Sequence, residues 1–358
     1  MKEKHKGQKP RAKCASERRQ FPASTVAMHS VQHFTLCSPE HDRIALLLVV
    51  ETLPSVPPLS TMRFAPSFST RRLQQLAATV ATALIVGSAG CAMLDAKQRE
   101  WIFQPSDKSW SGANTQGMQD VWIDYASQDG QQTRLHGLWM PAVRRDAPLL
   151  LYLHGARWNV SGSSPRIRRM NELGFSVLAI DYRGFGQSSQ GLPSEDMATE
   201  DAQAAWNWLA KQGPDQPRYI FGHSLGGAIA IDLARSVDNE AGVMVEGTFT
   251  SIADVVSSFR WGWLPVGPLI TQRFDSVDKV AQIGSPLLVV HGTADKLIPP
   301  ELGQRLFAAA QEPKRLLLID GGTHHNTQAL AQSQYRKALK DFFHTQRPPA
   351  KQQETATR

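Results

Sequence analysis

Residues 218–230 constrain the fold of this chain more than any other stretch. A β-rich run and an Ala-rich helical run are joined there by a Gly-x-Ser-x-Gly turn centred on Ser224. In such a strand–turn–helix corner the serine takes strained backbone angles, and a Cβ on Gly222 or Gly226 would collide with a neighbouring element. The corner exposes the Ser224 hydroxyl, and the N–H of Leu225 points at any negative charge that develops beside it. The sequence therefore predicts a nucleophilic serine, with Leu225 as an oxyanion donor.

The composition of the 358-residue chain allows a large globular core. Residues 1–90 hold 12 Lys or Arg and 5 Asp or Glu, whereas residues 91–358 hold 27 of each. Because this second part is formally neutral, we expect no nucleic-acid partner. The cysteines Cys14, Cys37 and Cys91 all lie at or before its start, which excludes a cysteine metal site within it. We expect a monomer without metal or cofactor.

The N-terminal region has the features of a targeting sequence. Residues 62–72 are basic, and residues 76–90 form an uncharged apolar run that ends in small residues. We interpret residues 62–90 as a secretory signal sequence and residues 1–61 as a non-native or disordered extension. The alternative is a basic extension ahead of a membrane anchor.

The end of this predicted signal resembles a bacterial lipobox. Small residues precede Cys91, although Ser88 stands where an aliphatic residue is usual. In a lipobox the cysteine is acylated and becomes the first residue of the mature protein. We therefore expect an exported, membrane-anchored lipoprotein that faces the periplasm or the cell surface. The alternatives are an ordinary cleaved signal and an uncleaved anchor.

The remaining sequence alternates between buried strands and helices. An approach segment, residues 91–120, leads to a predicted hairpin of residues 121–125 and 133–140 with a turn at Asp129-Gly130. The later strands are predicted at 149–153, 175–180, 219–221, 241–245, 286–290 and 315–319, and the helices at 166–173, 197–211, 301–310 and 328–344. This α/β pattern predicts a mostly parallel, doubly wound sheet with right-handed crossovers. The domain covers 121–345, with a short insertion at about 250–280, and a disordered tail follows at 346–358.

A serine nucleophile needs a base, and the base needs an orienting acid. Asp295 follows a predicted parallel strand, and a glycine-containing loop after the last strand carries His324 and His325. The carboxyl ends of parallel strands are where doubly wound sheets place their sites. We choose Asp295 as the acid, and the strand-end carboxylates Glu246 and Asp320 are its competitors.

A second oxyanion donor is expected from the loop after the first parallel strand, where the N–H of Ala156 has the right position. His154, in the same loop, is interpreted as a side chain that orders the loop. Arg183 is expected to pair with a carboxylate, and Asp275 is interpreted as structural.

Residues 139–343 resemble the α/β-hydrolase superfamily, and more narrowly the small-cap serine hydrolases grouped with serine aminopeptidases and protein depalmitoylases. The resemblance is carried by His154-Gly155, Asp181-Tyr182-Arg183-Gly184-Phe185-Gly186, Gly222-His223-Ser224-Leu225-Gly226-Gly227, Glu246 with Phe249-Thr250-Ser251, Arg273-Phe274-Asp275-Ser276, His291-Gly292 with Asp295, and His325-Asn326. The order Ser, Asp, His is also that of this fold. The chain departs from the family at Ala156-Arg157, where an Asn usually follows His-Gly.

The family's usual Gly-x-x-His-Asn loop decides between the two adjacent histidines. It matches Gly322, His325 and Asn326, so we choose His325 as the base. His324 would fit a version of the loop that is one residue shorter, and it is the alternative.

The resemblance implies a serine hydrolase that forms an acyl-enzyme. Its substrate is expected to be a small ester or acyl compound, cleaved at a carboxylic or thiol ester bond. A serine aminopeptidase, which would need a carboxylate cluster for the substrate ammonium, is one alternative, and a non-catalytic binding module is another. The short cap carries the aromatic residues Phe259, Trp261 and Trp263. We expect these aromatic side chains either to line an open apolar cleft or to pack the cap onto the body.

Overall fold

The computed structural model describes residues 70–108, 113–259 and 267–344. The predictions for residues 1–61, for the tail and for Trp261 and Trp263 of the cap lie outside these ranges. The described residues all belong to one compact unit, which begins at Phe68.

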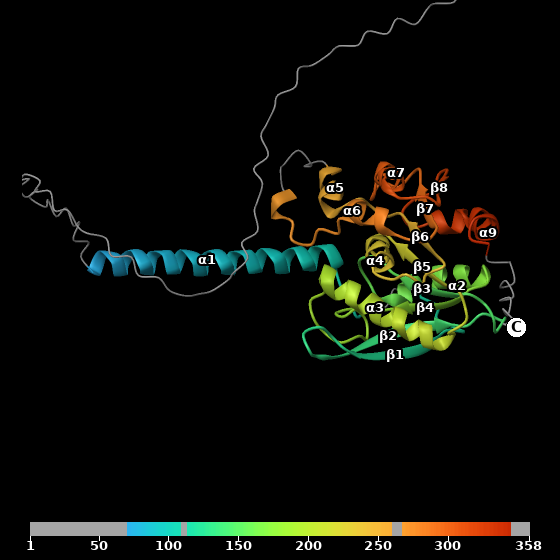
Figure 1. Cartoon of the computed structure of the whole chain (residues 1–358), viewed down its shortest axis with the longest axis horizontal. Helices are drawn as coiled ribbons and strands as arrows, with labels where there is room; N and C mark the ends of the chain where they lie inside the picture. Colours follow the sequence, from blue (N-terminus) through green and yellow to red (C-terminus); the bar gives the residue numbers. More distant parts are fainter. Residues whose placement is uncertain (1–69, 109–112, 260–266, 345–358) are drawn as a thin grey trace, which may run out of the picture. The chain divides into compact units, whose positions relative to one another are not determined.

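An eight-stranded sheet forms the centre of the molecule, in the order β1-β2-β4-β3-β5-β6-β7-β8 (Figure 1). Strands β1 and β2 form the predicted antiparallel hairpin, β2 also pairs antiparallel with β4, and β4 to β8 are parallel in the order given. The bounds are β1 Gln119–Ala126, β2 Gln132–Met140, β3 Leu149–Leu153, β4 Ser176–Ile180, β5 Arg218–His223, β6 Gly242–Glu246, β7 Leu287–Gly292 and β8 Lys314–Ile319. The predicted α/β class and mostly parallel sheet are confirmed.

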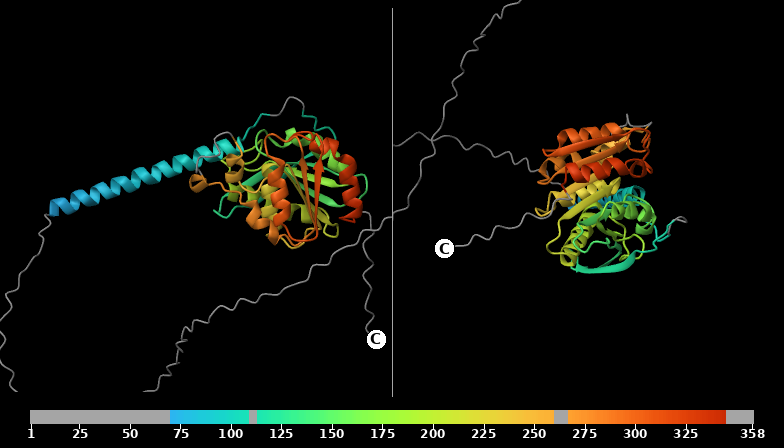
Figure 2. Two further views of the ribbon diagram at one scale, coloured as in Figure 1. Left: turned by 90° about the horizontal axis from the view of Figure 1, so that it is seen from above. Right: turned by 90° about the vertical axis from the view of Figure 1, so that its right-hand side faces the viewer.

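Helices cover both faces of the sheet (Figure 2). One layer consists of α3 (Glu195–Gln212), α4 (Leu225–Ala234) and α7 (Pro300–Ala309), and the other of α2 (Ser164–Glu172) and α9 (Gln332–Asp341). The side chains of β3 alternate between the two cores, because successive residues of a strand point to opposite faces. The helix predicted at 328–344 is instead two helices, since α8 (Thr327–Leu330) ends at Ala331 before α9 begins.

The cap consists of short elements. These are α5 (Ile252–Ser257), the 3₁₀ turn η2 (Gly267–Leu269), α6 (Ser276–Lys279) and the 3₁₀ turn η3 (Val280–Gln282); a further turn, η1 (Val160–Ser163), precedes α2. Side-chain oxygens begin two of the helices: Ser251 accepts the N–H of Asp254 in α5, and Ser194 accepts the N–H of Met197 in α3.

A single helix, α1 (Thr70–Phe103), crosses the expected boundary between signal and mature protein. The end of the apolar run predicts that boundary between residues 90 and 91, and the sequence of the following segment predicts no helix. Within the described residues α1 is the one helix long and apolar enough to cross a membrane by length and composition. Up to Leu94, every residue of α1 whose side-chain burial is described is exposed, and its last turns contact the body (Figure 1).

Candidate active site

Ser224 occupies the tight corner between β5 and α4. Its backbone angles, φ 56° and ψ −123°, lie outside the ordinary regions for a residue with a side chain. The Ser224 N–H donates to the Glu246 carbonyl oxygen at 2.9 Å, and the Thr248 hydroxyl donates to the Ser224 carbonyl oxygen at 2.9 Å. Contacts from the neighbouring strand β6 and the loop after it therefore hold the strained corner in place.

The two glycines of the motif are required by space. A Cβ on Gly222 would lie 2.2 Å from the carbonyl oxygen of Gly226, and a Cβ on Gly226 would lie 2.1 Å from that of Leu153. Both distances are far shorter than any normal contact, so the backbone would have to move. This is the steric reason that the sequence pattern predicts.

A chain of hydrogen bonds runs from Asp295 through His324 to Ser224. The Nδ1 atom of His324 lies 2.8 Å from Asp295 Oδ2, and its Nε2 atom lies 3.0 Å from Ser224 Oγ. With Nδ1–H donated to the carboxylate, Nε2 is free to accept the serine proton. Both His324 and Asp295 are buried, each 6% exposed. This arrangement can activate a hydroxyl nucleophile.

The choice of His325 is wrong as to which histidine contacts Ser224. His325 is exposed, and its ring meets the His324 ring edge-on with centroids 5.3 Å apart. The sequence favours His325 because it precedes Asn326. In the structure Asn326 Oδ1 accepts the Thr323 N–H at 2.7 Å and closes the turn. That turn directs His324 inward and its neighbour outward.

Asp295 is held as a carboxylate by its surroundings. One oxygen accepts the N–H groups of Leu297 and Ile298, each at 2.9 Å. Burial opposes ionisation, but hydrogen bonds from His291 and His324 outweigh it and lower the pKa of Asp295. An ionised acid in this position orients the His324 ring.

The competing carboxylates are engaged elsewhere. Glu246 accepts hydrogen bonds from Arg166 and from the Tyr335 hydroxyl, the latter at 2.7 Å. Asp320 accepts one from the Thr293 hydroxyl at 3.4 Å. As expected, Arg183 pairs with carboxylates, those of Glu200 and Asp201.

Arg166 is a member of the site that the sequence analysis missed. Its guanidinium is buried, pairs with Glu246, and donates to the carbonyl oxygens of His324 at 3.2 Å and His325 at 3.3 Å. His223 Nε2 lies 3.0 Å from the same His324 carbonyl, and burial together with Arg166 lowers the His223 pKa well below its usual range. The only sequence signal is position: Arg166 stands four residues before the buried Met170, on the inward face of α2.

The loop expected to supply the second oxyanion donor packs directly against Ser224. A Cβ on Gly155 would lie 3.0 Å from the Ser224 Cβ, so Ala156 follows at close range. The next two residues, Arg157 (φ 72°) and Trp158 (φ 62°), both have positive φ. Such strain persists only where other contacts fix the backbone. The N–H of Leu225 is the first of α4, as the sequence predicts.

The end of α1 supplies contacts that fix this loop. The Phe103 carbonyl accepts the Arg157 N–H at 2.9 Å, and Pro105 forms a β-bridge with Trp158. Phe103 itself is fully buried against Phe185 and Phe274. The segment predicted to be a mere approach therefore braces the loop beside Ser224.

His154 is buried in an aromatic setting and does not contact Ser224 by a hydrogen bond. Its ring packs on Tyr182 and Phe185, its Nε2 atom has no hydrogen-bond partner among the described residues and lies 3.9 Å from Asp181 Oδ1, and burial lowers its pKa. Asp275 pairs with Arg273. Both side chains fit the loop-ordering and structural roles expected for them.

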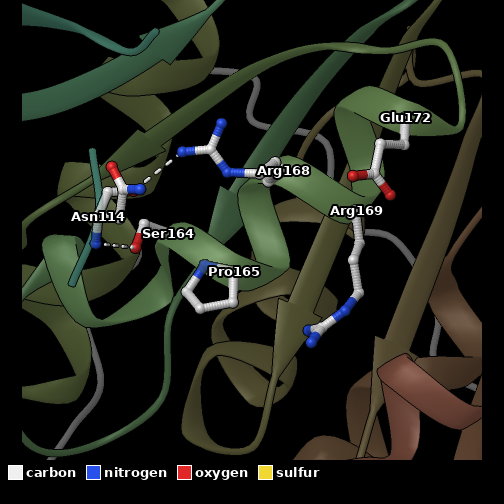
Figure 3. A pocket seen from close by; sticks show the side chains of 6 residues that line it. All are labelled: Asn114, Ser164, Pro165, Arg168, Arg169 and Glu172. Carbon is white, nitrogen blue, oxygen red and sulfur yellow. Dashed lines mark hydrogen bonds between the residues drawn. The ribbon is translucent and has the colours of Figure 1, made fainter. Parts of the chain in front are cut away.

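A polar pocket lies away from these residues, on the side of α2 opposite to Arg166. Figure 3 shows Arg168 bonded to Asn114, and Arg169 and Glu172 at its edge. None of Ser224, His324 and Asp295 lines it. No group of three or more potential metal ligands occurs among the described residues.

Cys91 lies within α1 and is exposed. The hydrogen bonds from α1 to the body begin after it, with Asp95, Gln98 and Arg99. The docked part of the helix would thus remain in a chain that begins at Cys91.

Comparison with known proteins supplies a family. Residues 145–274 match the family model described as serine aminopeptidase, S33. An uncharacterized protein of Mycobacterium tuberculosis is 33% identical over 269 residues, which cover 74% of this chain and 93% of the relative. The lysophosphatidylserine lipase ABHD12 of Danio rerio is 31% identical over 210 residues, 50% of this chain and 54% of that protein.

The fold also matches a solved structure. The Pyrococcus furiosus esterase Pf2001 superposes with a TM-score of 0.54 at 20% identity, over 67% of this chain and 98% of the esterase. Together with the eight-stranded sheet and the corner at Ser224, these similarities make the protein a hydrolase by fold and family. The chain belongs to the α/β-hydrolase superfamily.

Proposed function

We propose that the protein is a serine hydrolase that cleaves carboxylic or thiol esters through an acyl-enzyme. The observation that carries this proposal is the hydrogen-bond chain from Asp295 through His324 to Ser224, at a serine with φ 56°. Strained residues cluster at active sites, and a triad of this order is the one used by this fold.

In the proposed reaction Ser224 Oγ attacks the acyl carbonyl while His324 Nε2 takes the hydroxyl proton. Asp295 orients the ring and stabilises the imidazolium. The N–H groups of Leu225 and Ala156 stabilise the oxyanion, a contribution of about 10²–10³ in rate for one such donor. His324 then protonates the leaving alcohol or thiol. Water attacks the acyl-enzyme while His324 takes its proton; the bond between Ser224 Oγ and the acyl carbon breaks, His324 returns the proton to Ser224, and the carboxylic acid leaves.

The relatives support an ester rather than a peptide substrate. The names of two similar proteins describe a lipase and an esterase. An aminopeptidase, suggested by the name of the matching family model, would need a free carboxylate to bind the substrate ammonium. Within the described part of the chain, Asp295 and Glu246 near Ser224 already have partners.

The test is turnover of p-nitrophenyl esters by the parent protein and by Ser224→Ala. Loss of the nucleophile should lower kcat by several orders of magnitude, because only the oxyanion donors and binding remain. Ser333→Ala, an exposed serine on α9, is the matched control and should keep the parent rate. Activity of Ser224→Ala within tenfold of the parent would refute the nucleophile. Hydrolysis of aminoacyl p-nitroanilides but not esters would favour the aminopeptidase.

We further propose that α1 directs export and that Cys91 is acylated, so that a lipid anchors the enzyme to the outer side of a bacterial membrane. The small residues before Cys91 and the start of the body contacts beyond it support this. Retention of α1 as an uncleaved anchor would place the same helix end at a membrane.

A further inference from the structure

A groove of about 270 Å³ lies between the C-terminal part of α1 and the cap. The wall from α1 consists of Leu94, Trp101 and Ile102, whose spacing of seven and eight residues places them on one helix face. Gln98 stands on the same face. Its side-chain amide is already used, since it donates to the Leu269 carbonyl at 2.7 Å and accepts the Thr271 N–H at 2.9 Å.

The opposite wall comes from the cap. Val256 of α5 and Leu269 and Ile270 at the end of η2 face the α1 residues across the groove. No charged side chain is among the described residues that line it. Its volume is near the lower end of small-molecule sites, which are about 300–1,000 Å³. The groove can therefore take a hydrocarbon chain, and its described lining holds no charge for a charged headgroup.

The apolar residues around the groove are unusually exposed. Trp101 and Leu269 are each 60% exposed, and Leu94 is 41% exposed. Exposed apolar side chains that gather at one place indicate an interaction surface. The apolar stretch of α1 leads directly to this groove, and it indicates which surface the groove contacts.

The residues from Leu73 to Leu94 carry no charge, and α1 has the length and composition to cross a membrane. The polar contacts of α1 begin directly afterwards, where Asp95 accepts hydrogen bonds from Thr271 and Gln272. An acyl group on Cys91 would place the groove equally close to lipid, because Leu94 is only about 4.5 Å further along the helix axis. A spanning helix and a lipid anchor thus both put the groove at the boundary between lipid and water.

We propose that this groove binds the hydrocarbon chain of a membrane lipid drawn from the bilayer that holds α1. Trp101 of α1 and Val256 of α5 both line the groove. The lipid chain covers the exposed faces of Leu94 and Leu269, and removing their apolar surface from water favours binding. The site does not require Ser224 to act.

The experiment uses the full chain with Ser224→Ala in phosphatidylcholine vesicles that contain a phosphatidylcholine with a diazirine in its acyl chain. After irradiation, vesicle-bound protein is isolated by flotation, and the labelled peptides are identified by mass spectrometry. We expect label on the peptide that contains Val256, as well as on α1. Because Ser224→Ala cannot turn over an ester, the result is independent of the proposed hydrolysis.

Leu269→Gln places an amide in the groove and should lower the label on the Val256 peptide about tenfold per vesicle-bound protein, because a hydrocarbon chain no longer covers an apolar side chain there. Leu318→Gln, at an exposed leucine of β8, is the matched control and should label like the parent. Leu269 is largely exposed, so the variant should fold, which circular dichroism checks. An unlabelled Val256 peptide in vesicle-bound protein, or equal labelling of Leu269→Gln, would overturn the proposal.

Discussion

Strained backbone angles occur at the candidate active site. Ser224, Arg157 and Trp158 all have positive φ, and all three lie at or beside the corner between β5 and α4. Each such residue costs on the order of 1–3 kcal/mol and persists only if its neighbours hold it. Here the neighbours are the Glu246 carbonyl for Ser224 and the Phe103 carbonyl for Arg157.

The two adjacent histidines should behave very differently when they are removed. His324→Ala deletes the group 3.0 Å from Ser224 Oγ, so we expect a loss of kcat as large as that of Ser224→Ala. His325→Ala removes an exposed ring that touches the base only edge-on, and should cost less than about tenfold, or 1.4 kcal/mol. Ester turnover by the two variants measures this, and the reverse order would move the base to His325.

The sequence allows the serine and its acid to be predicted but not the histidine. Ser224 and Asp295 follow predicted strands, and strand ends meet at one edge of a parallel sheet. His324 and His325 are neighbours in one loop, and which ring faces Ser224 depends on the turn that Asn326 closes. That turn depends on three-dimensional hydrogen bonding, which a motif spacing does not contain.

Several separate elements meet at the buried ion pair of Arg166 and Glu246, next to the loop that carries His324 and His325. Arg166 from α2 and Tyr335 from α9 both bond to Glu246 at the end of β6, and Arg166 also holds the carbonyls of the loop after β8. This network connects the helix layer of α2 and α9 to the base. Burial lowers the Arg166 pKa and Glu246 raises it, and the balance is a raised pKa that keeps the guanidinium charged.

Glu246→Leu should destabilise the protein by about 3–5 kcal/mol, because it leaves the Arg166 charge buried without its carboxylate partner. Urea unfolding measures this free energy. The double variant Arg166→Met with Glu246→Leu removes both charges and should recover a large part of the loss. If Glu246→Leu lowers the free energy of unfolding by less than about 1 kcal/mol, or if the double variant is less stable than Glu246→Leu, then Arg166 and Glu246 do not form a coupled buried ion pair.

Such a network is beyond a sequence-based prediction. The parallel strands are predicted from continuous apolar runs, and right-handed crossovers between them follow from known connection rules, whereas the strand order comes from the structure. In the sequence, Arg166 looks like one more charged residue of a surface helix, because Arg168 and Arg169 follow it. These two arginines do line a polar pocket at the surface (Figure 3). The role of Arg166 appears only when the helix is packed.

At the scale of the whole molecule, α1 joins an apolar stretch long enough to cross a membrane to the loop beside Ser224. The helix that carries the apolar stretch also ends in Phe103, whose carbonyl braces the loop beside Ser224. The sequence predicted the apolar run but not its continuation as helix, because residues 95–103 are mixed polar and aromatic and their partners lie in the cap and beside α3.

Expression from Met62 in a bacterium tests the lipid anchor. We expect the protein in the membrane fraction with an acylated Cys91 as its first residue, and Cys91→Ser should either release it or leave it unprocessed. Mass spectrometry of the mature N-terminus distinguishes the outcomes. An intact α1 in the parent protein would instead establish an uncleaved anchor, and a terminus elsewhere would exclude lipidation.

The most direct test of the central claim is covalent labelling with a fluorophosphonate, which reacts with an activated serine. The folded parent protein should carry one adduct, and mass spectrometry should locate it on Ser224. Labelling should be lost in Ser224→Ala and be slowed by orders of magnitude in His324→Ala, while Ser333→Ala labels like the parent. An adduct on another serine, or no adduct on the folded protein, would contradict the assignment of Ser224, His324 and Asp295 as the catalytic triad.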